Sequence, residues 1–138
     1  MNRLVNNNRK GFTIIELMIV LMIIAILVAL AYPSFIDYLR KAKRAEAQEQ
    51  LLSWAIQQET WRSNNPGYNN ITPCTADNSI MPCNDENYQF DVVADGTSYT
   101  LEATAIGDQA NDSARNGDRC TPLTLNENNG KTPLVCWK

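Results

Sequence analysis

The fold is decided by one stretch of sequence, FTIIELMIVLMIIAILVALAYPSFI, which runs from Phe12 to Ile36 and carries a single charged side chain, Glu16. As a helix rising about 1.5 Å per residue, this stretch spans about 37 Å, more than the roughly 30 Å of a bilayer core. It is longer than the apolar region of a cleaved secretory signal and continues into helix-forming sequence. We therefore predict a transmembrane segment.

The remainder of the chain is a polar head that offers little chemistry. A length of 138 residues fits about one domain. The sequence has no histidine, which removes the commonest general base and metal ligand. Hydrolases built on a Ser/His or Cys/His pair are excluded, and we expect no enzyme, no catalytic residue, no cofactor and no metal.

The charge distribution argues against polyanionic partners. The leader, Met1 to Gly11, has three basic residues and no acid, whereas Ser63 to Lys138 has four basic residues against ten acids, a net charge of −6. A head of this charge repels nucleic acid and anionic lipid. Nucleic acid is therefore not an expected partner.

All four cysteines lie in the head, at positions Cys74, Cys83, Cys120 and Cys136. An even number predicts disulfides in an oxidising compartment, with three pairings open. Of these pairings we favour the sequential one, Cys74 with Cys83 and Cys120 with Cys136. Free or zinc-bound thiols are the less favoured alternative, because neither spacing is the short C-x2-4-C pattern of zinc sites. The positive charges on the two sides of the stem are about balanced, so they do not decide its orientation in the membrane. Disulfide formation would place the head outside the cytoplasm.

Glu16 requires compensation, because a carboxylate at mid-membrane costs about 2.5 to 3.5 kcal/mol on insertion scales. One interpretation places it near the interface, at a helix N-terminus that favours anions. The other begins with cleavage between Gly11 and Phe12, which creates an amino group four residues before the carboxylate. The two charges would then pair within the chain or between neighbouring chains.

The stretch from Gly11 to Val20, GFTIIELMIV, resembles the processing and stem motif of type IV pilin precursors (prepilins). The phrases Ala31 to Ser34 and Gly130 to Trp137 are most similar to minor pilins of the PilE type. The resemblance implies cleavage after Gly11, N-methylation of Phe12 and a role for Glu16 in registering each incoming subunit.

The resemblance also implies the partners and the location. These partners are other major and minor pilin subunits, the prepilin peptidase/N-methyltransferase, an inner-membrane assembly platform, and membrane lipid before assembly. The precursor would cross the bacterial inner membrane once, with a periplasmic head, and then enter an extracellular pilus. The expected function is that of a structural subunit of the pilus that supports pilus biogenesis, twitching motility and adhesion. We prefer a minor pilin to a major one.

Two alternatives share the stem. A type II secretion pseudopilin is disfavoured by the four cysteines, because the major pseudopilin commonly uses calcium instead. A DNA-binding competence pilin would use a basic stripe near its C-terminal loops, for which the chain offers only Arg115, Arg119, Lys131 and Lys138 among ten acids.

We expect three parts: a cleaved leader (1–11), a transmembrane and filament-core helix segment (12–36), and a globular head (37–138) that includes the rest of the helix. The fold class is α+β, with one helix from Phe12 to about Trp61, kinked at Pro33, packed by its second half on an antiparallel sheet of about four strands.

The second half of this helix has two faces. Apolar residues recur at helical spacing on one face, interrupted by Glu49: Tyr38, Ala42, Ala45, Leu52 and Ile56. Trp54 and Trp61, seven residues apart, form an aromatic stripe that we expect to pack on the sheet rather than to bind a ligand. The expected solvated face has polar residues: Arg40, Lys41, Lys43, Arg44, Glu46 and Gln50.

Alternating residues predict the strands of the head. Tyr88 to Ala94 and Tyr99 to Ala105, separated by an Asp-Gly turn, predict a hairpin. A second pair is expected at about Cys120 to Leu125 and Thr132 to Trp137. Three aspartates at 108, 112 and 118 raise the alternative of calcium binding, but their spacing does not fit a calcium loop, so a solvated loop is preferred.

Overall fold

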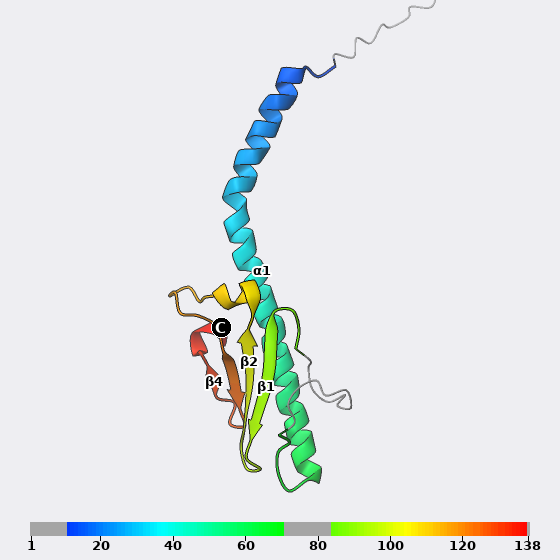
Figure 1. Cartoon of the computed structure of the whole chain (residues 1–138), viewed down its shortest axis with the longest axis vertical. Helices are drawn as coiled ribbons and strands as arrows, with labels where there is room; N and C mark the ends of the chain where they lie inside the picture. The colour runs from blue at the N-terminus through cyan, green and yellow to red at the C-terminus, as the bar shows by residue number, and fades with distance from the viewer. Residues whose placement is uncertain (1–10, 71–83, 138) are drawn as a thin grey trace, which may run out of the picture. The chain divides into compact units, whose positions relative to one another are not determined.

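The computed structural model describes residues 11–70 and 84–137. The chain divides into two compact units, Met1–Ile36 and Asp37–Lys138, which are described separately. One long helix, α1 (Ile14–Asn64), supplies residues to both units, and every strand belongs to the second (Figure 1).

The first unit contains the apolar part of α1. Its large hydrophobic side chains are exposed, from Phe12 at 80% to Phe35 at 57%. An 18-residue window of α1 has a mean hydropathy of 3.1 and none of it is buried, so by length and composition this helix can cross a membrane. Pro33 lies inside α1. The expected kink at Pro33 stays a prediction.

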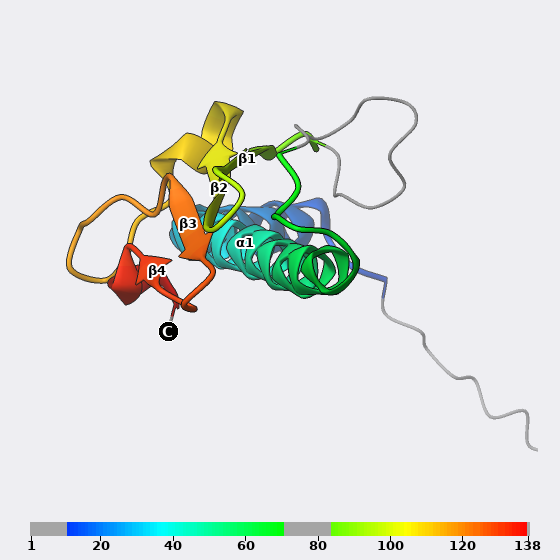
Figure 2. The ribbon, with the colours of Figure 1, turned by 90° about the horizontal axis from the view of Figure 1, so that it is seen from below.

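The second unit packs a four-stranded sheet on the second half of α1. The strands are β1 (Tyr88–Ala94), β2 (Tyr99–Ala105), β3 (Leu123–Asn126) and β4 (Lys131–Thr132), in the order β1-β2-β3-β4 with every pair antiparallel. Figure 2 shows these strands to one side of the helix. This arrangement confirms the α+β class, one helix on a four-stranded antiparallel sheet.

The β1–β2 hairpin forms where the alternation predicts it. Val92 pairs with Leu101, and both side chains are buried against the helix, as are their alternate neighbours along each strand. The turn is held by Asp95, whose Oδ1 accepts hydrogen bonds from the backbone N–H of Thr97 (3.0 Å) and Ser98 (2.7 Å). The core formed by the hairpin, β3 and the helix includes the fully buried side chains of Leu51, Trp54, Tyr88, Phe90, Leu101, Leu123 and Leu125.

The second strand pair is shorter than expected. β4 has only two residues, and Leu134–Trp137 forms a 3-10 helix, η2, instead of continuing the strand. Pro133 has no backbone N–H to donate to a ladder, which ends the strand. The Cys136 N–H then bonds to the Pro133 carbonyl at 3.0 Å, closing a turn.

The face of α1 that packs on the sheet agrees with the expectation at Trp54 but not at Tyr38 and Ile56. Its buried residues are Arg44, Ala47, Leu51, Trp54 and Gln58. Tyr38 (69% exposed) and Ile56 (68% exposed), on the apolar face of the sequence analysis, point away from the core. Trp54 is fully buried, as the aromatic stripe of Trp54 and Trp61 predicts. The face of Tyr38 and Ile56 stays exposed because the Leu51 and Trp54 face is also apolar, and the sheet covers that one.

Cysteine pairing is observed at one of the two expected places. Cys120 and Cys136 form a disulfide, which joins the segment before β3 to η2. The other expected pair, Cys74 with Cys83, lies outside the described residues and stays a prediction.

Candidate functional site

The sequence motif at the N-terminus coincides with the start of α1. Thr13 precedes the helix, and its Oγ1 accepts a hydrogen bond from the Glu16 backbone N–H at 3.2 Å. A threonine in this position satisfies one of the free N–H groups of the first turn, as N-cap residues do. The peptide bond between Gly11 and Phe12 therefore lies just before the helix, and Gly11 and Phe12 are both exposed.

Glu16 lies in the first turn of α1. A helix N-terminus carries a partial positive charge, which favours a carboxylate there. In the described part of the chain Glu16 makes no salt bridge. Its position suits both interpretations from the sequence, since a new amino group at Phe12 would also lie beside this turn.

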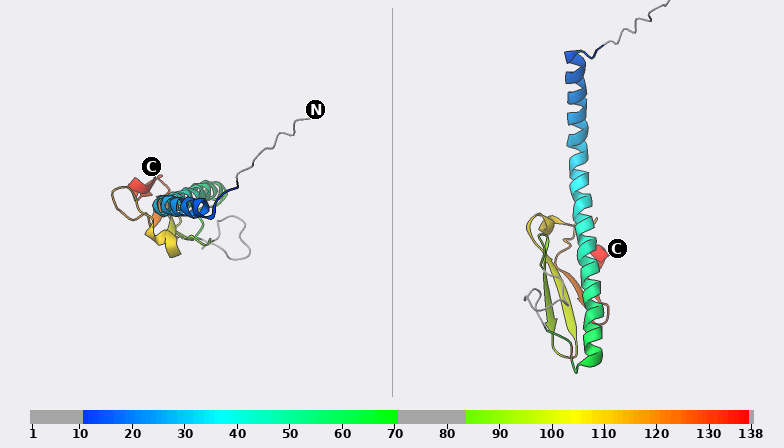
Figure 3. Two further views of the ribbon diagram at one scale, coloured as in Figure 1. Left: turned by 90° about the horizontal axis from the view of Figure 1, so that it is seen from above. Right: turned by 90° about the vertical axis from the view of Figure 1, so that its right-hand side faces the viewer.

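A second group of polar residues joins α1 to the segment after β2. The 3-10 helix η1 (Gly107–Asn111) and Asp112 face the helix, and we call their contacts with it the helix clamp. Arg40 donates to the Asp108 carboxylate through Nε (3.2 Å) and Nη2 (2.9 Å). Arg44 Nη1 donates to Asp112 Oδ2 at 2.9 Å. Figure 3 (right) shows η1 and the sheet along the same side of the helix in this unit.

Gln109 is the centre of the helix clamp. It is buried, and its Nε2 donates to the Arg40 carbonyl (2.9 Å) and to the Tyr88 hydroxyl (3.0 Å). One side chain thus links α1, η1 and β1. Burial raises the pKa of Tyr88 to about 12, so the hydroxyl stays protonated at neutral pH, although the bond from Gln109 opposes this shift.

The two ion pairs of the helix clamp differ in their surroundings. Asp108 is exposed, and its hydrogen bonds from Arg40 lower the pKa of its carboxyl. Asp112 is buried, with 3% of its side chain exposed, and burial raises the pKa of its carboxyl although Arg44 opposes that shift. Arg44 Nη1 also donates to Cys120 Sγ at 2.9 Å, so the buried cation joins the carboxylate to the disulfide.

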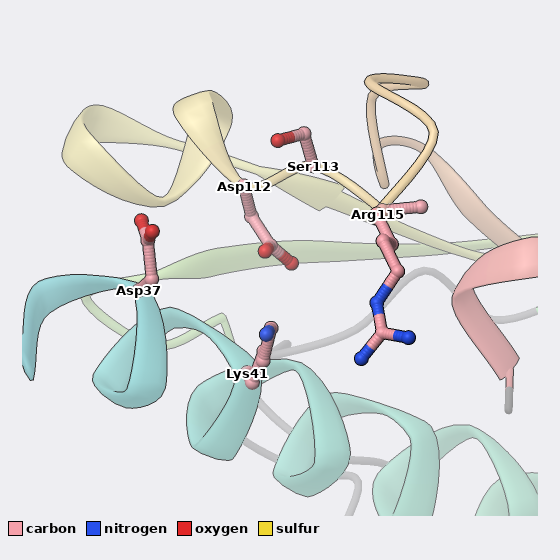
Figure 4. Close-up of a pocket in the computed structure, with 6 residues that line it drawn as sticks. Asp37, Lys41, Asp112, Ser113 and Arg115 are labelled. Atoms are coloured by element: carbon pink, nitrogen blue, oxygen red, sulfur yellow. The ribbon is translucent and has the colours of Figure 1, made fainter. Parts of the chain in front are cut away.

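A small pocket of about 170 Å³ lies beside the helix clamp. Asp37 and Lys41 line it from the helix, and residues 112–115 line it from the loop after η1. Figure 4 shows the Arg115 guanidinium extended toward the helix and the Asp112 carboxylate between the two walls. Two cations and two carboxylates balance in charge, so the pocket has no net preference for an anion or a cation.

The aspartates raised as calcium ligands do not converge. Asp108 and Asp112 each bind an arginine, and Asp118 Oδ2 accepts a hydrogen bond from Asn116 Nδ2 at 2.6 Å. Within residues 11–70 and 84–137 no group of three His, Cys, Asp or Glu side chains is placed to hold a metal. The roles of Thr13 and Gln109 and the burial of Arg44 were not predicted from the sequence. Only Thr13, in the pattern Thr-x-x-Glu, carried a readable signal.

The fold has a counterpart among solved structures. A type IV pilin from Shewanella oneidensis superposes with a TM-score of 0.55 over 72% of this chain and 98% of that one, at 24% identity. At this identity the likeness shows the fold alone. It supports the arrangement of one long helix on a four-stranded antiparallel sheet.

Sequence relatives match mainly through the stem. The Myxococcus xanthus type IV major pilin protein PilA is 40% identical over 66 residues, which is 48% of this chain and 30% of that protein. The Moraxella nonliquefaciens fimbrial protein is 56% identical over 41 residues, 30% of this chain and 27% of that protein. The Neisseria gonorrhoeae type IV major pilin protein PilE1 is 38% identical over 68 residues, 44% of this chain and 32% of that protein. The chain therefore spans about a third of the length of these curated relatives.

Two family patterns divide the chain between them. Residues 6–32 match the prokaryotic N-terminal methylation motif, and residues 33–124 match the family described as type IV minor pilin ComP, DNA uptake sequence receptor. The pattern over residues 33–124, together with the methylation motif at the start of an apolar helix, makes the chain a type IV pilin, the class of structural pilus subunits, which are not enzymes. Within this class, the chain belongs to the ComP minor pilin family, whose pattern covers two thirds of its length.

Proposed function

We propose that the chain is a minor subunit of a type IV pilus, held in the bacterial inner membrane by residues 12–36 until it enters the filament. The observation that carries this proposal is the methylation motif over residues 6–32. It supports cleavage between Gly11 and Phe12, a bond that lies just before the start of α1. The head, residues 37–138, lies on the periplasmic side, in keeping with the Cys120–Cys136 disulfide.

Processing removes residues 1–11 and leaves Phe12 as the methylated N-terminus. The new amino group lies one helical turn from Glu16, and assembly pairs the Glu16 carboxylate with the amino terminus of a neighbouring subunit. Neither charge then remains unpaired in an apolar environment, where isolated charges are costly. The partners are other pilins, the prepilin peptidase/N-methyltransferase and the assembly platform.

The test of processing is the mass of the chain recovered from membranes and from sheared filaments. The mature chain should begin at methylated Phe12, and Gly11→Leu should leave an uncut precursor in the membrane. Recovery of the wild-type chain with its first eleven residues attached would contradict the proposal. Loss of type II secretion with intact pili in a deletion strain would identify a pseudopilin instead.

A second function, DNA binding by the head, is favoured by one observation. The family that matches residues 33–124 is described as a DNA uptake sequence receptor. The net charge of −6 over Ser63 to Lys138 opposes this function. Electrophoretic mobility shift with the mature chain and duplex DNA at low salt tests it. Binding should weaken steeply as salt rises, and no shift at low salt would remove this function.

A further inference from the structure

The pocket beside the helix clamp brings two cations together from its opposite walls. Lys41 lines it from α1, and Arg115 lines it from the loop after η1. Figure 4 shows the Arg115 guanidinium reaching across from the loop toward the helix turn that carries Lys41. Both residues are exposed, and neither makes a salt bridge within residues 11–70 and 84–137. A guanidinium fork and an ammonium that face one gap suit the oxygens of a phosphate group.

The two carboxylates of the pocket differ in how firmly they are held. Asp112 accepts a hydrogen bond of 2.9 Å from Arg44 and is buried. Asp37 is 66% exposed, and its contact with Arg40 Nη1 is long, at 3.5 Å. The same arginine is bound more closely by Asp108, at 2.9 Å. Asp37 is therefore the carboxylate that remains available to a cation from outside the chain.

These groups suit a small ligand that carries one charge of each sign. Asp37 and Lys41 are four residues apart, which is about one helical turn of 5.4 Å. A phosphate and an ammonium joined by a two-carbon link, as in a phosphoethanolamine group, are separated by a similar distance. The pocket volume of about 170 Å³ corresponds to about five or six waters at roughly 30 Å³ each, so it admits such a group but not an acyl chain.

Two pocket residues follow the predicted transmembrane segment directly in the sequence. Asp37 is the first residue after 12–36, and Lys41 is the fifth. Five helical residues rise about 7.5 Å, and the headgroup layer on each side of a bilayer core is about 5 to 7.5 Å thick. Helix side chains lean toward the N-terminus, so Lys41 leans back toward that layer. The zwitterions that this part of the chain meets in a membrane are therefore lipid headgroups.

We propose that the pocket binds the headgroup of a zwitterionic phospholipid, phosphatidylethanolamine, with the phosphate between Lys41 and Arg115 and the ammonium beside Asp37. The inference deepens the proposed function and rests on it, because the stem must be held in a membrane. A neutral headgroup also avoids the repulsion that the acidic head exerts on anionic lipid. The bound lipid holds this side of the head at the membrane surface, and the chain must release it on entering a filament.

Native mass spectrometry of the full-length chain in a neutral detergent tests the two cations. The chain is titrated with phosphatidylethanolamine, and Lys41→Ser combined with Arg115→Ser should lower its affinity about tenfold. The matched control is Arg119→Ser, which removes an exposed cation of the same loop that does not line the pocket, and it should bind as wild type does. Lys41→Arg combined with Arg115→Lys keeps both cations and should retain most of the binding. Unchanged affinity in the double serine variant, or an equal loss in Arg119→Ser, would overturn the proposal.

The lipid preference tests the role of Asp37. Wild type should bind phosphatidylethanolamine at least fivefold more tightly than phosphatidylglycerol with the same acyl chains, because only the first supplies an ammonium. Asp37→Asn removes the carboxylate charge and should abolish most of this preference. Lipid bound around the stem is common to all variants, so it does not create the difference. Equal binding of the two lipids by wild type would contradict the assignment.

A soluble phosphate ester has the same chemistry as the headgroup, so a second arm compares the two sources. O-phosphorylethanolamine and inorganic phosphate are added as competitors of the lipid. The lipid should bind at least tenfold more tightly than either, because its acyl chains hold it in the same micelle as the stem. Equal affinity for O-phosphorylethanolamine would make the ligand a soluble phosphate ester and overturn the lipid assignment.

The filament readout separates this inference from the proposed function. If the processed chain is found in sheared filaments but shows no preference for phosphatidylethanolamine, the lipid site is wrong and the pilus role stands. If the preference depends on Asp37, Lys41 and Arg115 but the chain never enters filaments, the lipid site stands and the pilus role fails.

Discussion

Arg44 and Asp112, which are 68 positions apart in the sequence, form a buried ion pair of 2.9 Å between α1 and the segment after η1. The same arginine contacts Cys120 Sγ, so one buried cation joins the helix, the loop and the disulfide. A charge in this position is tolerated only because its partner is fixed beside it, since an unpaired buried charge is strongly destabilising. Loss of one partner alone should therefore weaken the contact between the helix and the head.

Arg44→Met should lower the free energy of unfolding by about 3 to 5 kcal/mol, because it leaves Asp112 buried without a partner. Replacing both residues, Arg44→Met with Asp112→Leu, should recover much of that loss. Urea denaturation of the mature chain in detergent, followed by tryptophan fluorescence, measures both effects. Arg40→Met, which removes the exposed pair with Asp108, is the matched control and should have a far smaller effect. Equal losses for the two arginines would show that burial does not set the strength of the pair.

Replacing Cys120 and Cys136 together by alanine should lower the free energy of unfolding by about 3 kcal/mol, because the disulfide closes a loop of 16 residues. The same denaturation experiment measures it, with and without reductant. Reductant should weaken the wild-type chain and leave the doubly substituted chain unchanged at this site. A wild-type chain as stable reduced as oxidised would contradict the prediction.

Acid should weaken the turn between β1 and β2. Hydrogen bonds from the backbone and side chains of Ser98 and Thr97 lower the pKa of Asp95 from 3.8 to about 2. Because the folded pKa is lower than the unfolded one, the stabilisation is present above pH 3.8 and is lost as the pH falls toward 2. Asp95→Asn keeps an acceptor oxygen and should flatten this part of the stability profile. An unchanged profile in Asp95→Asn would assign the acid sensitivity to other groups.

Asp112 should act in the opposite direction. Burial raises the pKa of its carboxyl in the folded state, so ionisation of Asp112 is less favourable in the folded chain than in the unfolded one. The contribution of Asp112 to stability is therefore largest at low pH. It falls as the pH rises through the unfolded pKa and then the folded pKa. Asp112→Asn should therefore steepen the loss of stability on acidification. The measurement is the same pH series of urea midpoints, and a shallower acid limb in Asp112→Asn would contradict it.

Glu16→Gln separates a helix-capping role from charge pairing. The substitution keeps the backbone N–H that Thr13 Oγ1 accepts, but it removes the carboxylate charge. We expect normal cleavage after Gly11 and a marked fall in the amount of chain recovered from filaments. Thr13→Ala is the control, which weakens the cap by about 1 kcal/mol and keeps the charge. Filament incorporation equal to wild type in Glu16→Gln would argue against charge pairing.

Structural features that depend on patterns within a few neighbouring residues were predictable. The apolar stem, the processing motif before it and the hairpin around Asp95 all follow from patterns within a few residues, because helix and strand periodicities are local properties. The disulfide between Cys120 and Cys136 was also anticipated, although spacing alone left three pairings open. The end of the sheet was not, because the sequence alternation continues past Pro133 while its missing N–H stops the ladder.

Composition and local pattern were enough to predict the two kinds of segment in this chain, an apolar helical stem and a polar head that carries the cysteines. Which of the apolar side chains on the second half of α1 are covered depends on where the sheet packs. A helix repeats every 3.6 residues, so this segment offers two apolar faces, and the sheet covers the one that buries Leu51 and Trp54. This packing buries Arg44 with Asp112 and leaves Tyr38, Leu52 and Ile56 exposed.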